Sequence, residues 1–164
     1  MEYSMRELVA AAQGSTIGQA ALLTEMLETG MTEDELKKVM RDRLEVMRAS
    51  VDNGMDPYQR SLSGLSGGQA ARLNDAVKAD RTVSGSLMGR AAVRAMAVAE
   101  CNACMGRIVA APTAGSCGIL PAAILTLQEE KDISDDALVD ALFTAAAVGA
   151  VIAQRASVSG AEGG

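Results

Sequence analysis

The sequence of 164 residues contains no histidine and no tryptophan, and only one phenylalanine and two tyrosines. Without histidine the chain offers neither an imidazole general base nor a histidine metal ligand, so chemistry of that kind needs another segment or subunit. Aromatic residues make up 2% of the chain and the net charge is −6. Nucleic-acid-binding proteins carry basic surfaces and stacking aromatics, so this composition argues against a nucleic-acid partner.

Long hydrophobic runs are also scarce. The longest uncharged run of the C-terminal half, residues 141–153, is shorter than the roughly 18 residues that a membrane span requires. It predicts a buried helix and no membrane association. The N-terminus MEYSMREL is charged and lacks the apolar core of a signal peptide, and the cysteine count is odd, so we expect a reduced, cytoplasmic protein.

The apolar residues that are present are small or flexible: the chain is 49% hydrophobic, with ten methionines and abundant alanine. Such a core predicts helices that pack closely together. The length suits one domain, or a piece of a larger one. Residues 87–104 are especially rich in alanine and glycine, which predicts a helix that neighbours approach on several faces.

Helix-start and helix-stop patterns run through the whole chain and predict an all-α fold, a compact multi-helix bundle. The first expected helix ends near Gln13-Gly14, the second covers about 15–29 with Gly30 as its stop, and the third runs from a Thr32 capping box to Gly54. The fourth follows a Ser66 cap, and two more cover residues 87–104 and 122–130. The last begins at a Ser134 cap and ends near residue 154. The third is the clearest amphipathic helix. Residues 108–111 are the only candidate strand.

Residues 61–68 (SLSGLSGG) are the most linker-like stretch. They overlap LSGGQ at 65–69, the signature of ABC-transporter ATPases. That motif requires a nucleotide held by a P-loop, and no GxxxxGK[ST] pattern occurs in the sequence. We interpret the match as coincidental, with Ser66 serving as a helix cap.

The helical pattern stops most sharply within residues 107–121. Pro112 breaks an apolar run, and Thr113, Gly115, Ser116 and Gly118 follow before a new helix that has Pro121 in its first turn. Backbone N–H groups near 115–118, at the start of that helix, would bind a carboxylate or phosphate, with the Thr113 and Ser116 hydroxyls as further donors. The alternative is a glycine-rich helix start that binds nothing.

The three cysteines Cys101, Cys104 and Cys117 would supply three thiolates to a four-iron four-sulfur cluster. Within an alanine-rich helix, however, cysteines three residues apart behave as small buried hydrophobes, and we expect no metal at these thiols. The chain closes on a second Ser/Gly-rich loop, residues 157–164, which reads as if cut within a motif.

Taken together, these stretches resemble one family, the catalytic alpha subunit of bacterial iron–sulfur L-serine dehydratase. The resemblance is carried by residues 63–68 (SGLSGG), 100–103 (ECNA), 106–122 (GRIVAAPTAGSCGILPA), 143–149 (FTAAAVG) and 156–164 (ASVSGAEGG). It covers essentially the whole chain.

The resemblance also implies a truncation. In the family a cluster-ligating cysteine directly follows the GAEGG string, and two more ligands come later, so this span (1–164) holds no metal ligand and the first is expected just after Gly164. The cluster is a cofactor of the full-length protein, and the three cysteines present here do not occupy ligand positions. We expect this polypeptide alone neither to hold a cluster nor to turn over serine.

For the full-length subunit the resemblance implies an all-helical lyase that deaminates L-serine to pyruvate and ammonia, with an iron of the cluster acting as Lewis acid on the substrate hydroxyl. The substrate would be bound by two loops that face a common pocket, with Thr113, Ala114, Gly115, Ser116 and Gly118 in the first and Ser157, Ser159, Gly160 and Glu162 in the second. The general base is not identified. A histidine of the beta subunit or beta domain is the implied source, in a homo- or hetero-oligomer.

Two other functions stay open at this point. One is an ATPase-associated module built on LSGGQ, which the missing P-loop disfavours. The other is a helical interaction domain without catalysis, because the exposed edge of a truncated bundle needs a partner to cover it.

Overall fold

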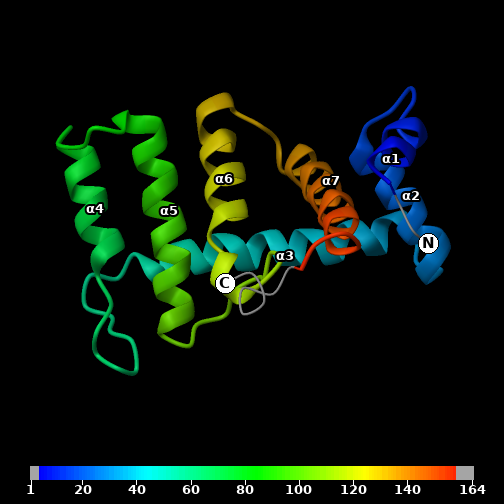
Figure 1. The fold of residues 1–164 in the computed structure, drawn as a ribbon. Helices are drawn as coiled ribbons and strands as arrows, with labels where there is room; N and C mark the ends of the chain where they lie inside the picture. Colours follow the sequence, from blue (N-terminus) through cyan, green and yellow to red (C-terminus); the bar gives the residue numbers. More distant parts are fainter. Residues whose placement is uncertain (1–3, 158–164) are drawn as a thin grey trace. The chain divides into compact units, whose positions relative to one another are not determined.

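The computed structural model describes residues 4–157, whose regular structure is entirely helical, with no strand among them (Figure 1). The elements are α1 (Met5–Ala11), α2 (Ile17–Thr29), α3 (Glu33–Gly54), α4 (Gln69–Lys78), α5 (Gly85–Ala103), the 3₁₀ turn η1 (Ala114–Ser116), α6 (Ile119–Lys131) and α7 (Asp135–Ala153). The all-α prediction is confirmed. Residues 108–111, the candidate strand, have no regular structure.

The chain divides into two units. Unit 1 comprises residues 1–42 and 134–164, and unit 2 comprises residues 43–133, so the boundary falls within α3. Each unit has its own set of helix contacts: α2 packs on α7 and α1 in unit 1, and α5 packs on α4 and α6 in unit 2.

Local capping chemistry begins the helices where the sequence predicts. Ser4 and Glu7 form a reciprocal capping box at α1. At α3 the Glu35 amide donates to the Thr32 hydroxyl over 3.3 Å, and the Thr32 amide donates to the Glu35 carboxylate over 2.8 Å. The Thr32 amide and the Thr32 hydroxyl both donate to the Glu35 carboxylate and lower its pKa. Ser134 caps α7 by accepting from the Ala137 amide.

One cap was missed by the sequence analysis. Thr16 and Gln19 form a third capping box at the start of α2, so that helix begins at Ile17 rather than at Ser15. Gly30 ends α2 in the left-handed conformation, as predicted. Pro121 lies in the first turn of α6, as predicted, and this helix begins at Ile119.

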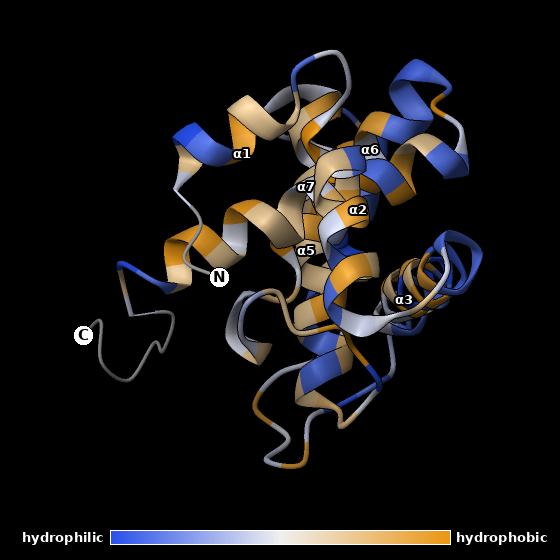
Figure 2. Ribbon diagram, turned by 90° about the vertical axis from the view of Figure 1, so that its right-hand side faces the viewer, coloured by the Kyte–Doolittle hydropathy of each residue, from blue (hydrophilic) through white to orange (hydrophobic). Residues whose placement is uncertain are grey.

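α3 is amphipathic as predicted, and apolar and hydrophilic residues alternate around it (Figure 2). Its buried apolar residues are Leu36, Met40, Leu44 and Met47. Charged residues on the other faces form i,i+4 pairs such as Lys37 with Glu33 at 2.6 Å.

In unit 2, α4, α5 and α6 lie side by side (Figure 1). Two glycines bring other segments against the backbone of α5: a Cβ on Gly54, the last residue of α3, would lie 1.8 Å from the Ala97 carbonyl oxygen, and one on Gly118, before α6, would lie 2.4 Å from that of Ala95. Partly buried between α5 and α6, Arg94 donates to the buried Thr126 hydroxyl at 2.8 Å and pairs with Glu129. The small-residue composition therefore produces the close packing that it predicted.

In unit 1, α7 packs on α2 at a similarly close contact. A Cβ on Gly18 would lie 2.2 Å from the Asp140 carbonyl oxygen. The N-terminal half of α7 is buried through Leu138, Val139, Leu142 and Phe143, and Arg41 holds Asp136 at its first turn over 2.8 Å.

The prediction that residues 141–153 form a fully buried helix is wrong for the C-terminal half of α7. Ala146, Ala150 and Ile152 are exposed, because α2 and α1 cover only part of its circumference. By length and apolar composition α7 also reaches what a membrane span needs, since the helix starts at Asp135 and not at 141, and 28% of its most apolar window is buried. Its double-aspartate first turn and its packing against α2 are equally those of a core helix in a soluble protein.

Candidate functional site

The bend at residues 113–118, the first predicted ligand loop, is closed by hydrogen bonds among its own residues. The Ser116 hydroxyl lies 3.0 Å from the Ala111 carbonyl oxygen and 3.2 Å from the Thr113 hydroxyl, and it accepts from the Thr113 amide at 3.3 Å. The Ser116 amide in turn donates to the Thr113 carbonyl at 3.3 Å. The Ser116 hydroxyl therefore holds the turn closed, a role that was not predicted from the sequence, and its part in ligand binding stays a prediction.

The outer part of the bend faces solvent. Ala114 and Gly115 are exposed, and a Cβ on Gly115 would meet only the Thr113 hydroxyl oxygen, at 3.8 Å. A small ligand therefore has room to approach the backbone here. The inner part is different, because Cys117 and Gly118 are buried and Gly118 rests on the backbone of α5.

Behind the bend, α6 starts without a side-chain cap. Its N-cap residue is Gly118, and no side chain accepts from the first turn there. The first amides of a helix have no partner within the helix, and the helix dipole favours negative charge at that end. The predicted arrangement, an exposed bend leading into a helix N-terminus, is thus present in unit 2.

The C-terminal end of α5 contacts the loop before α4 through a buried carboxylate. Glu100, 5% exposed, accepts hydrogen bonds from the amides of Gly68 at 2.8 Å, Gln69 at 2.7 Å and Ala70 at 3.2 Å. Its carboxylate caps α4 from another helix. The prediction that Ser66 caps this helix is wrong, since the N-cap is Gly68 and Glu100 satisfies its amides.

The same contacts bear on the LSGGQ match. Two of its amides, those of Gly68 and Gln69, donate to Glu100, and the Gly67 amide donates to the Gln69 side chain at 2.7 Å. These donors are engaged within the protein and do not face a phosphate.

Two residues after Glu100, Asn102 reaches the ligand bend. Its side-chain amide nitrogen donates to the Ala114 carbonyl oxygen at 3.2 Å. The α5 helix then ends in a tight turn, with Met105 at φ 62° and the Gly106 amide donating to the Cys101 carbonyl at 2.8 Å. Glu100 and Asn102 thus attach two glycine-rich loops to one helix end. In the sequence, both residues were recognised only as part of the ECNA motif that carries the family resemblance.

Two of the three cysteines, Cys101 and Cys117, are buried thiols. Burial raises the pKa of the Cys101 and Cys117 thiols, and the electrostatic effect of Cys104 and Cys117 raises the pKa of Cys101 further. Both thiols are therefore protonated at neutral pH. Cys101 lies 3.9 Å from the Arg107 carbonyl oxygen, as a thiol donor would. Within residues 4–157 no three side chains of His, Cys, Asp or Glu gather as metal ligands.

The structure describes only one residue of the second predicted ligand loop, residues 157–164. Ser157, its first residue, is exposed after the end of α7. Ser159, Gly160 and Glu162 lie outside the described residues, and so does the prediction that the two loops share a pocket.

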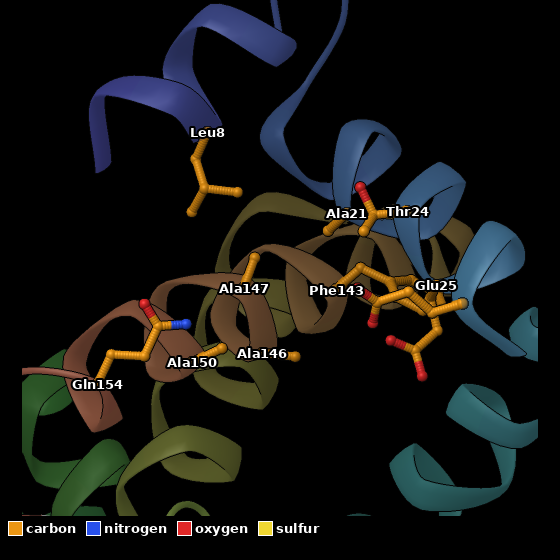
Figure 3. A pocket seen from close by; sticks show the side chains of 10 residues that line it. Leu8, Ala21, Thr24, Glu25, Phe143, Ala146, Ala147, Ala150 and Gln154 are labelled. Carbon is orange, nitrogen blue, oxygen red and sulfur yellow. The ribbon is translucent and has the colours of Figure 1, made fainter. Parts of the chain in front are cut away.

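Unit 1 contains a pocket of about 220 Å³ between α1, α2 and α7 (Figure 3). Its apolar walls are four alanines, Leu8 and Phe143, and its polar lining residues are Thr24, Glu25, Glu28 and Gln154. None of the predicted site residues lines it.

Comparison with known proteins identifies relatives over nearly the whole chain. The family model described as "Serine dehydratase alpha chain" matches residues 12–164. The chain is 37% identical over 148 residues to the "Probable L-serine dehydratase, alpha chain" of Bacillus subtilis (strain 168), which covers 90% of this chain and 49% of the relative. It is 31% identical over 152 residues to the "L-serine dehydratase, alpha chain" of Peptoniphilus asaccharolyticus, covering 93% and 52%.

A third relative, the "L-serine dehydratase" of Streptomyces coelicolor (strain ATCC BAA-471 / A3(2) / M145), is 33% identical over 160 residues, which are 96% of this chain and 35% of that protein. The chain therefore spans about half the length, or less, of these curated relatives. No solved structure matches it. The matched residues 12–164 include the bend, Glu100 and Asn102.

Proposed function

Because the chain belongs to the serine dehydratase alpha chain family, we propose that it forms part of a lyase that converts L-serine to pyruvate and ammonia. Within that enzyme we assign it the binding of the substrate carboxylate at residues 113–118. The observation that carries this assignment is the exposed, braced bend at the uncapped start of α6. The enzyme would act in amino-acid catabolism in the cytoplasm.

The chemistry available at the bend is anion binding. Exposed backbone at Ala114 and Gly115, together with the Thr113 hydroxyl and the N-terminus of α6, supplies donors to a carboxylate and no competing negative charge. Ser116 supports this by holding the turn closed. Ser157, Ser159, Gly160 and Glu162 keep the role predicted for them, as the second wall near the cluster edge.

The proton chemistry must come from elsewhere in the enzyme. Glu100 is the buried acid nearest in sequence to the bend, but its carboxylate accepts three backbone N–H groups and is not poised to take a proton from a substrate. The chain has no histidine. We therefore propose that the general base belongs to the beta subunit or beta domain.

The four-iron four-sulfur cluster implied by the family resemblance does not fit the thiols described here. Cys101 and Cys117 are buried, and within residues 4–157 no three side chains of His, Cys, Asp or Glu gather as a ligand set. We place the cluster ligands in the part of the full-length protein that lies outside this chain.

The proposal is tested at Gly115, where a side chain has room. Gly115→Asp puts a negative charge where the carboxylate is expected to bind, and Gly115→Asn adds the same volume without charge. In the full-length enzyme, pyruvate formation should show a KM for L-serine at least ~10-fold higher for the aspartate variant than for the asparagine variant, about 1.4 kcal/mol of lost binding. Equal KM values for the two variants would show that no carboxylate binds at this bend.

A helical interaction domain remains the second candidate. The observation that favours it is the exposed C-terminal half of α7, where Ala146, Ala150 and Ile152 lie uncovered. Size-exclusion chromatography of the chain alone tests it: a monomer at tens of micromolar would show that this face does not associate by itself.

A further inference from the structure

The bend at 113–116 is held from two directions. Ser116 closes it from within, and Asn102 holds it from α5 through a single hydrogen bond to the Ala114 carbonyl oxygen. We propose that Asn102 is a positioning residue for substrate binding: by holding this carbonyl it directs the Gly115 N–H toward the substrate carboxylate. The inference rests on the proposed function of the bend.

The peptide unit that joins Ala114 and Gly115 links the Asn102 hydrogen bond to the direction of the Gly115 N–H. The Ala114 carbonyl and the Gly115 N–H belong to the same peptide plane, and in a trans peptide they point in opposite directions. A carbonyl drawn toward α5 by the Asn102 amide therefore turns the Gly115 N–H away from α5. Since Gly115 is exposed and has open space around it, that N–H is presented to the solvent side of the bend.

Asn102 is poorly placed to act as a general stabiliser. Its hydrogen bond to Ala114 is a solvent-exposed contact. The end of α5 is independently fixed by Glu100, which lies two residues away and hence about 200° around the helix. Removing the Asn102 amide should therefore leave α5 in place and free only the peptide between residues 114 and 115.

Steady-state kinetics of the full-length enzyme test the proposal. Asn102→Ala removes the donor, and Asn102→Asp keeps the shape but offers only acceptors. We expect KM for L-serine to rise about 10-fold in the alanine variant with kcat within twofold, because a contact to the carboxylate is made equally in the ground and transition states. Asn102→Asp should raise KM further. Asn53→Ala, at an exposed position in α3, is the matched control and should leave both constants unchanged.

Hydrogen exchange and melting separate positioning from folding. In the 164-residue chain, Asn102→Ala should speed exchange at residues 113–116 alone and leave the melting temperature nearly unchanged. A large loss of melting temperature, or a fall in kcat at constant KM, overturns the proposal. If Gly115→Asp raises KM and both Asn102 variants do not, this inference fails while the proposed function stands. If none of them moves KM, the carboxylate site itself is wrong.

Discussion

Replacing the buried Glu100 with alanine should destabilise unit 2 more than replacing any single carboxylate at its surface. The Glu100 carboxylate is the acceptor for three amides at the start of α4, at 2.7–3.2 Å, and two of the three donor residues, Gly68 and Ala70, are themselves buried. Truncation removes the acceptor and leaves these donors without water or protein partners. A cavity remains where the side chain was.

The magnitude follows from the hydrogen bonds. Bonds to a charged group contribute about 1.5–3 kcal/mol each, but three bonds to one carboxylate are not additive. Loss of an exposed cap costs up to about 2 kcal/mol, and removal of one partner from a buried charged contact costs about 3–5 kcal/mol. We therefore expect about 3–5 kcal/mol for Glu100→Ala, and about 1–3 kcal/mol for Glu100→Gln, which keeps one acceptor oxygen.

Urea unfolding measures the loss, and amide hydrogen exchange locates it. Exchange should accelerate first at residues 68–70 and then along α4. Asp75→Asn, at an exposed position on α4, is the control and should stay within about 0.5 kcal/mol of the original protein. A Glu100→Ala protein that unfolds within about 1 kcal/mol of the original, with residues 68–70 still protected, would refute the capping role.

Three further predictions concern other contacts. Gly18→Ala should destabilise unit 1 by about 1–3 kcal/mol, since its Cβ would lie 2.2 Å from a backbone oxygen of α7. Gly149→Ala, in open space on α7, should instead stabilise unit 1 by about 0.5–1 kcal/mol. Thermal melts that shift in the same direction for both variants would contradict the close-contact argument. A side-chain hydrogen bond from Arg94 lowers the pKa of Glu129, so this pair stabilises the fold above the ordinary carboxyl pKa of 4.5 and ceases to do so as the pH falls through the lowered value. Glu129→Gln should therefore lower the free energy of unfolding by under about 1 kcal/mol at pH 7 and leave it unchanged in strong acid. A loss independent of pH would exclude the ion pair as its cause. Burial raises the pKa of the Cys117 thiol, so iodoacetamide at pH 7.5 should modify Cys117 in urea but not in the folded chain, as read by mass spectrometry; rapid labelling without urea would mean that the thiol is accessible.

Features that depend on neighbours in sequence were predictable. The capping boxes at Ser4 and Thr32, and the left-handed stop at Gly30, each involve residues within four positions of one another. Their chemistry is complete in the local sequence, so the pattern alone locates the helix ends. The same holds for the turn-rich bend before α6.

Features that depend on distant residues were not. The cap of α4 comes from Glu100, about thirty residues away, and local reasoning gave that role to Ser66 instead. Two features of the sequence did point to it. Glu100 is the single acid within α5, a helix of small and mostly apolar residues, and two glycines, which have no side chain to cap a helix, directly precede α4. Neither feature names the other, so only the fold connects them.

Composition was also a poor guide to how much of α7 is covered. An alanine-rich helix reads as buried on all sides, yet burial depends on how many neighbours the fold supplies, and α2 and α1 leave Ala150 and Ile152 exposed. The hydrogen bonds of Ser116 within its own turn were not predicted either, because a hydroxyl in a tight turn bonds its own backbone as readily as a ligand.

The contact between Gly118 and Ala95 has a consequence for how this protein tolerates change. Where main chain rests on main chain, the separation of the two segments is independent of the size of any side chain. Conservative exchanges among the aliphatic residues of α5 and α6 can alter rotamers and local volume while the distance between Gly118 and the backbone of α5 stays the same. Drift in the interior of unit 2 should thus leave the shape of residues 113–118 untouched, and only a substituent on Gly118 itself would lift the bend.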